Sequence, residues 1–247
     1  MNELLLYKYR LKLHRILENF LGFQIFNISR HGHRDYADMK HVGHEISVIF
    51  DVGANVGQSA YKFSSAFPKA VIHCFEPTSE AYKRLKINVK GMKNIICHQI
   101  PLGSRNEVSK LYLAPQSVSS SLIKPDCVVG EEVVNVCKLD DLALENRVEK
   151  IDLLKIDTEG FDLEVLKGAN EMLSSCKVVF ILVEVGFHPG DKRHVLFDDV
   201  RSYLLPKGYS VFGFYEQQLE WSGESRLRYA NVCFVNEQAL SKVKTNV

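Results

Sequence analysis

The stretch DVGANVG, from Asp51 to Gly57, decides the fold of this chain. It follows a short apolar strand expected at residues 48–50 and leads into a helix expected over residues 58–67. Its glycines let the backbone turn tightly and approach a ligand closely, and the helix N-terminus offers N–H groups to a carboxylate or phosphate. An acid at the strand end also suits a cationic amine. We therefore predict a nucleotide-cofactor site formed by Asp51, Gly53, Ala54, Asn55 and Gly57.

Strands and helices alternate along the chain from this turn onward. The expected strands cover residues 48–51, 71–75, 94–99, 151–157 and 178–185, and the expected helices cover residues 58–67, 80–90, 140–148, 163–173 and 196–206. This alternation implies a parallel sheet with right-handed crossovers. Residues 104–139 break the rhythm and predict a β-hairpin-like insertion with a polar tip at 116–121, and two strands at 209–215 and 228–235 finish the chain. We expect a lead-in over residues 1–46 and one α/β domain over residues 47–247.

A second functional element, Phe75-Glu76-Pro77, stands at the end of the next expected strand. A carboxylate at this place can accept both hydroxyls of a ribose. Pro77 stops the strand and releases Glu76 towards the crevice at the strand ends, so both residues join the predicted cofactor site.

Two other nucleotide sites are disfavoured by the glycine spacing. The dinucleotide fingerprint needs three glycines in this turn, and the chain has only Gly53 and Gly57. A phosphate-binding Walker loop needs Gly-Lys-Ser/Thr, and Gly57 is followed by Gln58. A nucleotide-dependent oxidoreductase therefore remains only as an alternative enzyme, and a cofactor-binding scaffold without activity remains as the alternative outside enzymology.

The third element is the stretch KIDTEG, residues 155–160, at another expected strand end. Ligands of open α/β sheets bind outside the carboxyl ends of the strands, so Asp157 and Glu159 should lie beside the cofactor. Either could act as a general base, as could His188 after the following strand. The alternatives are a helix cap for Asp157, a surface loop for His188, and a divalent cation shared by Asp157, Glu159 and Glu184, although we assign no metal site.

These motifs together resemble the FkbM-type methyltransferases, which are similar to class I S-adenosylmethionine-dependent enzymes. The matching stretches, in the family's order, are 51–57, 75–77, 138–142, 155–160 and 165–169. The resemblance implies a Rossmann-like fold with a mostly parallel seven-stranded sheet, helices on both faces and an antiparallel C-terminal strand. It also implies O-methylation of a sugar or natural-product hydroxyl, with S-adenosylmethionine as cofactor and S-adenosylhomocysteine as product, and it places Asp157 beside the cofactor. Residues 1–46, 114–132 and 186–228 match no family motif, so the acceptor should be recognised there.

The composition fits this reading. The chain has 247 residues, 46% of them hydrophobic and 25% charged, which is ordinary for a soluble globular protein. Its net charge of +1 lacks the basic excess of a nucleic-acid-binding protein. No secretory signal is visible and the longest apolar run, 178–183, is too short to span a bilayer, so we expect a cytoplasmic protein. The six cysteines form no C-x-x-C pair and are expected to be reduced thiols.

The lead-in offers two further features. Residues 3–21 predict a helix with a basic side, which we expect to dock on its own domain or on a second copy of the chain, the alternative being a membrane surface. Four histidines, His31, His33, His41 and His44, lie in a stretch that reads as a loop near the active site. Metal binding by these histidines is the less favoured alternative.

Overall fold

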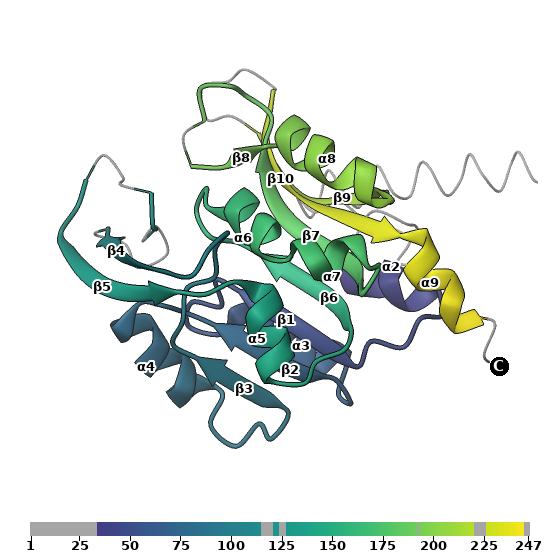
Figure 1. Ribbon diagram of the computed structural model, residues 1–247, viewed down its shortest axis with the longest axis horizontal. Coiled ribbons are helices and arrows are strands. Elements are labelled where there is room, and N and C mark those ends of the chain that lie inside the picture. Colours follow the sequence, from purple (N-terminus) through teal and green to yellow (C-terminus); the bar gives the residue numbers. More distant parts are fainter. Residues whose placement is uncertain (1–33, 115–120, 124–126, 192, 220–225, 245–247) are drawn as a thin grey trace, which may run out of the picture.

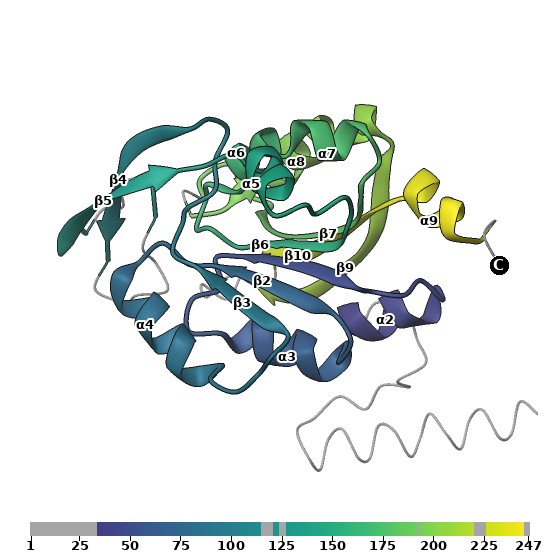
Figure 2. The ribbon, with the colours of Figure 1, turned by 60° about the horizontal axis from the view of Figure 1, so that its bottom comes forward.

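The computed structural model describes residues 34–114, 121–123, 127–191, 193–219 and 226–244. These residues form a central β-sheet with helices on both faces (Figures 1 and 2). The sheet runs in the order β3-β2-β1-β6-β7-β10-β9, and the short strand β8 pairs with the end of β7. Its strands are β1 Val48–Val52, β2 Val71–Phe75, β3 Ile95–His98, β6 Ile151–Ile156, β7 Val178–Gly186, β8 Val195–Leu196, β9 Tyr209–Leu219 and β10 Leu227–Asn236.

The order of the strands creates a crevice in the middle of the sheet. The chain starts at β1, builds outward through β2 to β3, and then returns to add β6 on the other side of β1. Loops leaving the carboxyl ends of β1 and β6 therefore run to opposite sides, and ligands bind between them in such folds. All of these pairs are parallel, whereas β10 is antiparallel to both β7 and β9. The predicted mostly parallel sheet with helices on both faces and an antiparallel strand near the C-terminus is thus confirmed, although β8 gives it eight strands where seven were expected.

Each face of the sheet has its own hydrophobic core. One core packs the sheet against α5 Leu139–Glu145, α6 Asp162–Gly168, α7 Asn170–Ser174 and α8 Phe197–Leu204. The other packs it against α2 Asp35–His41, α3 Gln58–Ala66, α4 Ser79–Asn88 and α9 Glu237–Lys244. The central strands are largely apolar because both faces are covered; all six residues of β6 are buried, Asp152 and Lys155 included.

The insertion predicted over residues 104–139 is confirmed as a hairpin. Strands β4 Glu107–Leu113 and β5 Gly130–Val136 pair in antiparallel fashion and form a separate two-stranded sheet. Figure 1 shows this hairpin beside α4. Two contacts fix it there, because Glu132 of β5 accepts hydrogen bonds from the backbone N–H and the hydroxyl of Ser79, the first residue of α4 (3.2 and 2.8 Å).

Several elements differ from the predictions. The expected loop at 29–45 contains a helix, α2, whose Met39 is buried in the core although most of its sequence is polar. The helix expected over 163–173 is divided into α6 and α7. It breaks after Gly168, where an added Cβ would lie 2.0 Å from the carbonyl oxygen of Gly103, so the chain is constrained by this close approach. The 3-10 turn Leu205–Lys207 follows α8, and α9 follows the last strand, where no helix was expected.

The described histidines of the lead-in have separate partners. His44 Nε2 lies 2.8 Å from Asp152 Oδ1, and Asp152 Oδ2 accepts the N–H groups of Ser47 and Val48 (2.8 and 3.0 Å), which fastens the lead-in to β6. His41 instead contacts the carbonyl of Ala37 one helical turn earlier. Within the described ranges, no group of three or more His, Cys, Asp or Glu side chains could hold a metal ion.

Some predictions fall on other parts of the chain. The basic helix at 3–21, His31, His33 and the hairpin tip at 116–120 lie outside the described residues. The boundary drawn at residue 46 stays a prediction. None of the helices in the described ranges has both the length and the apolar character that crossing a bilayer requires.

Candidate active site

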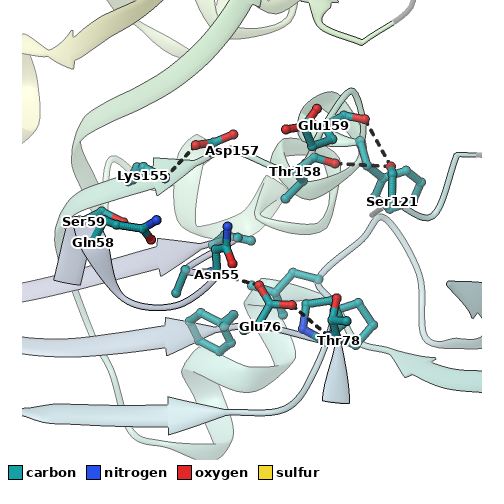
Figure 3. A pocket seen from close by; sticks show the side chains of 18 of the residues that line it. Asn55, Gln58, Ser59, Glu76, Thr78, Ser121, Lys155, Asp157, Thr158 and Glu159 are labelled. Atoms are coloured by element: carbon teal, nitrogen blue, oxygen red, sulfur yellow. Dashed lines mark hydrogen bonds and ion pairs between the residues drawn. The ribbon is translucent and has the colours of Figure 1, made fainter. Parts of the chain in front are cut away.

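A cavity of about 390 Å³ opens at the carboxyl ends of β1, β2 and β6 (Figure 3). This volume is within the usual range for small-molecule sites. Loops after these three strands form its walls, and the β4–β5 hairpin contributes Leu111, Ser121 and Leu122. The predicted residues that line it are Gly53, Ala54, Asn55, Glu76, Pro77, Asp157 and Glu159.

The loop after β1 is shaped by its glycines. The N–H groups of Gly53 and Ala54 both donate to the carbonyl of Phe75 at 3.0 Å, which holds the loop over the end of β2. Gly53 has φ +82°, and a Cβ there would lie 1.8 Å from the carbonyl oxygen of Asp157. Only glycine fits a left-handed position with backbone so close. Gly57, with φ +98°, begins α3 and packs against Leu85, so it supports the loop from behind the cavity wall.

Asp51 lies beneath the cavity. Strand β1 continues to Val52, so Asp51 is inside the strand and its side chain is fully buried. Its Oδ2 accepts a hydrogen bond from the Ser59 hydroxyl (2.8 Å), and its Oδ1 lies 3.5 Å from the ammonium of Lys155. Burial raises the pKa of Asp51, and Lys155 opposes that rise. Asp51 therefore acts on the cavity through Ser59 and Lys155, which both line it.

The carboxylate of Glu76 faces the loop after β1. Glu76 is only 6% exposed, and its Oε2 accepts the N–H of Asn55 at 2.9 Å while its Oε1 accepts the N–H of Thr78 at 2.8 Å (Figure 3). Burial raises the pKa of Glu76, and these amide donors partly offset the rise. An ionised carboxylate has about four acceptor positions. The backbone amides use two of them and the Thr78 hydroxyl also bonds to the carboxylate, so part of its acceptor capacity remains for a ligand hydroxyl.

A buried lysine holds the third loop. Lys155 Nζ lies 3.1 Å from Asp157 Oδ2 in addition to its contact with Asp51. Burial opposes the charge on Lys155, but the attraction of Asp157 and Asp51 outweighs it and raises its pKa. The ammonium therefore stays charged and fixes the direction of the Asp157 carboxylate, which Figure 3 shows across the cavity from Glu76.

The loop from Asp157 onward is braced from two sides. Buried Asp162 accepts the N–H groups of Thr158 and Gly160 (3.0 and 3.2 Å), and burial raises the pKa of Asp162 to about 6. The hydroxyl of Ser121, next to the β4–β5 hairpin, donates to the carbonyl of Glu159 at 3.1 Å. The left-handed turn at Glu159, with φ 54°, is thereby held in place.

Glu159 lies at the edge of the cavity. Its Oε2 lies 3.0 Å from the guanidinium Nη2 of Arg193. Burial raises the pKa of Glu159, and the hydrogen bond and charge of Arg193 partly offset this. Arg193 was not singled out from the sequence, because a single arginine in an irregular stretch carries no pattern.

His188, the third predicted base, is exposed and does not line the cavity. Its Nδ1 accepts the N–H of Gly190 at 3.0 Å. His194 does not line the cavity either; its Nε2 lies 3.0 Å from Glu184 and its Nδ1 lies 2.8 Å from Asp191. Burial opposes its charge, yet the two carboxylates raise its pKa. Glu184 therefore belongs to a local network with His194.

The two ends of the cavity differ in chemistry. One end is apolar and is lined by Ile100, Pro101, Leu102, Leu111, Leu122 and Phe161. The other end is polar and is lined by Asp35, Lys62, Glu216 and Asn231. Sequence reasoning found neither set, because the residues come from segments that are far apart along the chain.

Two polar side-chain atoms on the cavity wall lack a hydrogen-bond partner in the described part of the chain. They are Asn55 Oδ1 and Thr158 Oγ1, both buried, and they lie on the loops that face each other. Buried polar atoms are nearly always satisfied, so these two are unusual features of the cavity wall.

Comparison with known proteins identifies relatives for this arrangement. A family model described as the methyltransferase FkbM domain matches residues 51–211. The hexuronic acid methyltransferase AglP of Haloferax volcanii is 29% identical, over 62% of this chain and 62% of its own length. The 2-O-methyltransferase NoeI of Sinorhizobium fredii is 26% identical, over 54% of this chain and 61% of its own. The matches thus span less than two thirds of either relative. A fibrillarin structure from Aeropyrum pernix overlaps with a TM-score of 0.45 at 13% identity, over 78% of this chain and 68% of that one.

Proposed function

The chain belongs to the FkbM methyltransferase family, and we propose that it transfers a methyl group from S-adenosylmethionine to a hydroxyl of a glycan or natural-product acceptor. The observation that carries this proposal is the position of Glu76. Its carboxylate is held by the Asn55 and Thr78 amides on the cavity wall and keeps acceptor capacity for a hydroxyl of a ribose.

The remaining cavity accommodates the other parts of this cofactor. The apolar end between Ile100, Leu102 and Leu111 suits the adenine ring. The loop after β1 and the hydroxyl of Thr158 offer polar atoms to the amino-acid end, which accounts for the buried oxygens of Asn55 and Thr158. When bound, S-adenosylmethionine supplies an electrophilic methyl group on its sulfonium.

Asp157 is our first candidate for the residue that handles the acceptor. Its carboxylate lies beside the polar end of the cavity and is oriented by the ammonium of Lys155. In this role it accepts a hydrogen bond from the acceptor hydroxyl, positions the oxygen for in-line attack and takes the proton as the new C–O bond forms. The Asp157 side chain is 36% exposed, so the proton can pass on to solvent.

Glu159 is the second candidate for the base. Burial raises its pKa, which makes its carboxylate a stronger base, but the contact with Arg193 holds it at the cavity edge. His188 is assigned no step, because it lies outside the cavity. The names of the relatives support a sugar hydroxyl as acceptor: AglP is a hexuronic acid methyltransferase and NoeI is a 2-O-methyltransferase.

Calorimetry with S-adenosylmethionine and S-adenosylhomocysteine tests the cofactor, and mass spectrometry of the denatured protein tests for either nucleotide carried through purification. We expect saturable heat with both. A correctly folded protein, checked by circular dichroism, that gives no heat with either nucleotide would rule out the proposal.

The catalytic assignment needs a separate measurement. We expect Asp157→Asn to lower turnover about 100-fold or more, as for loss of a general base, while cofactor affinity changes little. Glu159→Gln is the second test. Glu145→Gln, on the exposed surface of α5, is the matched control and should behave like the wild type. Wild-type turnover in both Asp157→Asn and Glu159→Gln would remove both residues from the mechanism.

A further inference from the structure

The polar end of the cavity forms a recess beyond Asp157. We call it the acceptor recess and define it by four side chains, Asp35 of α2, Lys62 of α3, Glu216 of β9 and Asn231 of β10. A second hollow of about 310 Å³ adjoins it and shares Asp35, Lys62 and Glu216 as wall residues. The two hollows therefore have these three side chains in common.

Lys62 stands at the centre of the acceptor recess and is already paired. Its Nζ lies 3.1 Å from Glu216 Oε1 and 3.4 Å from Asp35 Oδ2. Glu216 Oε2 also accepts a hydrogen bond from the side-chain amide of Asn231 at 2.8 Å. Burial opposes the charge of Lys62, but the two carboxylates outweigh it and raise its pKa. One ammonium is thus shared between two carboxylates.

The four side chains of the acceptor recess carry two carboxylates and one ammonium, an excess of one negative charge, while Arg34 lines only the adjoining hollow. The neighbouring pair of Lys155 and Asp157 does not neutralise it, because Lys155 also balances buried Asp51. An acidic ligand would bring a further carboxylate or phosphate against Asp35 and Glu216, and like charges at such sites disfavour the wrong partner. A hydroxyl does the opposite, since it donates a charge-assisted hydrogen bond to a carboxylate.

The acceptor recess is built largely by residues outside the family domain. The family model covers residues 51–211, whereas Asp35, Glu216 and Asn231 lie before or after it. Helix α2 is held on β9 by a hydrogen bond from the Tyr215 hydroxyl to Asp38 Oδ2 (2.9 Å). The walls of the recess are therefore a property of this chain and do not follow from membership of the family.

We propose that the acceptor recess binds the methyl acceptor and selects an uncharged, hydroxyl-bearing sugar ring over an acidic one. This inference rests on the proposed function, because it assumes that the apolar end and Glu76 hold the cofactor. It separates this chain from its relative AglP, which is named for a hexuronic acid. Hydroxyls of the ring donate to Asp35 and Glu216, while Lys62 keeps the two carboxylates in place.

Matched pairs of sugars test the selection. The probes are methyl glucoside with methyl glucuronide, and methyl galactoside with methyl galacturonide, which differ only in a CH₂OH group replaced by a carboxylate. The full chain is assayed for transfer of a radiolabelled methyl group from S-adenosylmethionine. Binding of each sugar to the protein saturated with S-adenosylhomocysteine is measured by saturation-transfer NMR. We expect the neutral member of each pair to be favoured about tenfold or more in kcat/KM, as for a like-charge mismatch at a binding site.

Two variants that remove charge but keep shape show whether the recess is responsible. In Asp35→Asn combined with Glu216→Gln, we expect the preference for the neutral sugar to fall about tenfold, because the repulsion of the acidic one is removed. The Kd of S-adenosylmethionine should stay within about twofold of the wild type. Glu145→Gln again serves as the control for an exposed carboxylate, and it should leave the preference unchanged.

The outcomes separate the two proposals. Absence of heat with S-adenosylmethionine in the folded protein would overturn the proposed function itself. Cofactor binding together with an equal or greater preference for the acidic sugars would overturn only the acceptor recess. The acceptor-recess proposal is also overturned if the double variant keeps the wild-type preference. It is overturned as well if the cofactor binds but neither neutral sugar is bound or methylated.

Discussion

The replacement Glu76→Gln separates the roles of charge and shape in the cofactor site. Glutamine has the same length and can still accept one backbone N–H through its remaining oxygen. Its NH₂ group, however, would face the other amide donor, either that of Asn55 at 2.9 Å or that of Thr78 at 2.8 Å. The variant therefore loses one hydrogen bond within the protein and the negative charge offered to the ribose.

Both losses have an expected size. Leaving one buried donor without its acceptor costs about 1–3 kcal/mol of folding free energy. A hydrogen bond from a ligand hydroxyl to a charged group contributes about 1.5–3 kcal/mol, so the Kd of S-adenosylmethionine should rise about 10- to 150-fold. Glu76→Ala removes every acceptor and should weaken binding at least as much.

Titration calorimetry with S-adenosylmethionine and with S-adenosylhomocysteine measures the change in Kd, and urea denaturation measures the change in stability. Both nucleotides carry the same ribose, so both should lose affinity to the same extent. A folded Glu76→Gln protein that binds both within twofold of the wild type would refute the ribose assignment. Equal affinity for the wild type and Glu76→Ala would refute it more strongly.

Three further predictions concern the loops around the cavity. Gly53→Ala should lower the unfolding free energy by about 3 kcal/mol or more, because its Cβ would lie 1.8 Å from backbone. Gly43 also has a positive φ but has open space around it, so Gly43→Ala should cost about 1–2 kcal/mol. Equal losses of stability in urea denaturation would contradict the role of the close approach at Gly53. Lys155→Met leaves two carboxylates without their buried partner and should lower stability by about 3–5 kcal/mol, and thermal unfolding at wild-type temperature would disprove this. Burial raises the pKa of Asp162 from 3.8 to about 6, so the stability that it contributes is present below about pH 4 and lost as the pH rises through 6. Over that pH range the unfolding free energy of the wild type should therefore fall relative to that of Asp162→Asn. If it rises with pH instead, the pKa of Asp162 is not raised in the folded protein and the prediction is wrong.

The cofactor end of the site follows from local sequence, and the structure shows why. The residues that line it in Gly53–Asn55 and at Glu76 stand immediately after strands that are apolar except for one residue each, Asp51 in β1 and His73 in β2. A strand buried on both faces has a strong local signal, and the turn that follows it is bound to lie at the sheet edge. Asp51 was expected at the end of its strand, facing the cofactor. In the structure β1 continues to Val52, and the Asp51 side chain is buried beneath the cavity.

The acceptor end could not be predicted in the same way. Lys62 lies 27 positions after Asp35 and 154 positions before Glu216. No spacing along the chain therefore reveals that these three side chains form ion pairs. Helix α2 has only seven residues, and its stability comes from tertiary contacts such as the buried Met39 rather than from a periodic pattern. The contact of His194 with Glu184 was not predicted, for a similar reason. The two-residue strand β8, which brings His194 back to Glu184, is too short to leave a periodic signal.

A backbone contact joins the loop after β1 to the loop after β6. The N–H of Asp157 donates to the carbonyl of Val52 at 3.0 Å, and Gly53 presses against the Asp157 carbonyl with no room for a methyl group between them. These two loops therefore cannot move independently of each other. A change in the backbone at the glycine turn therefore requires a change in the backbone at Asp157, so the two loops keep a fixed spatial relation.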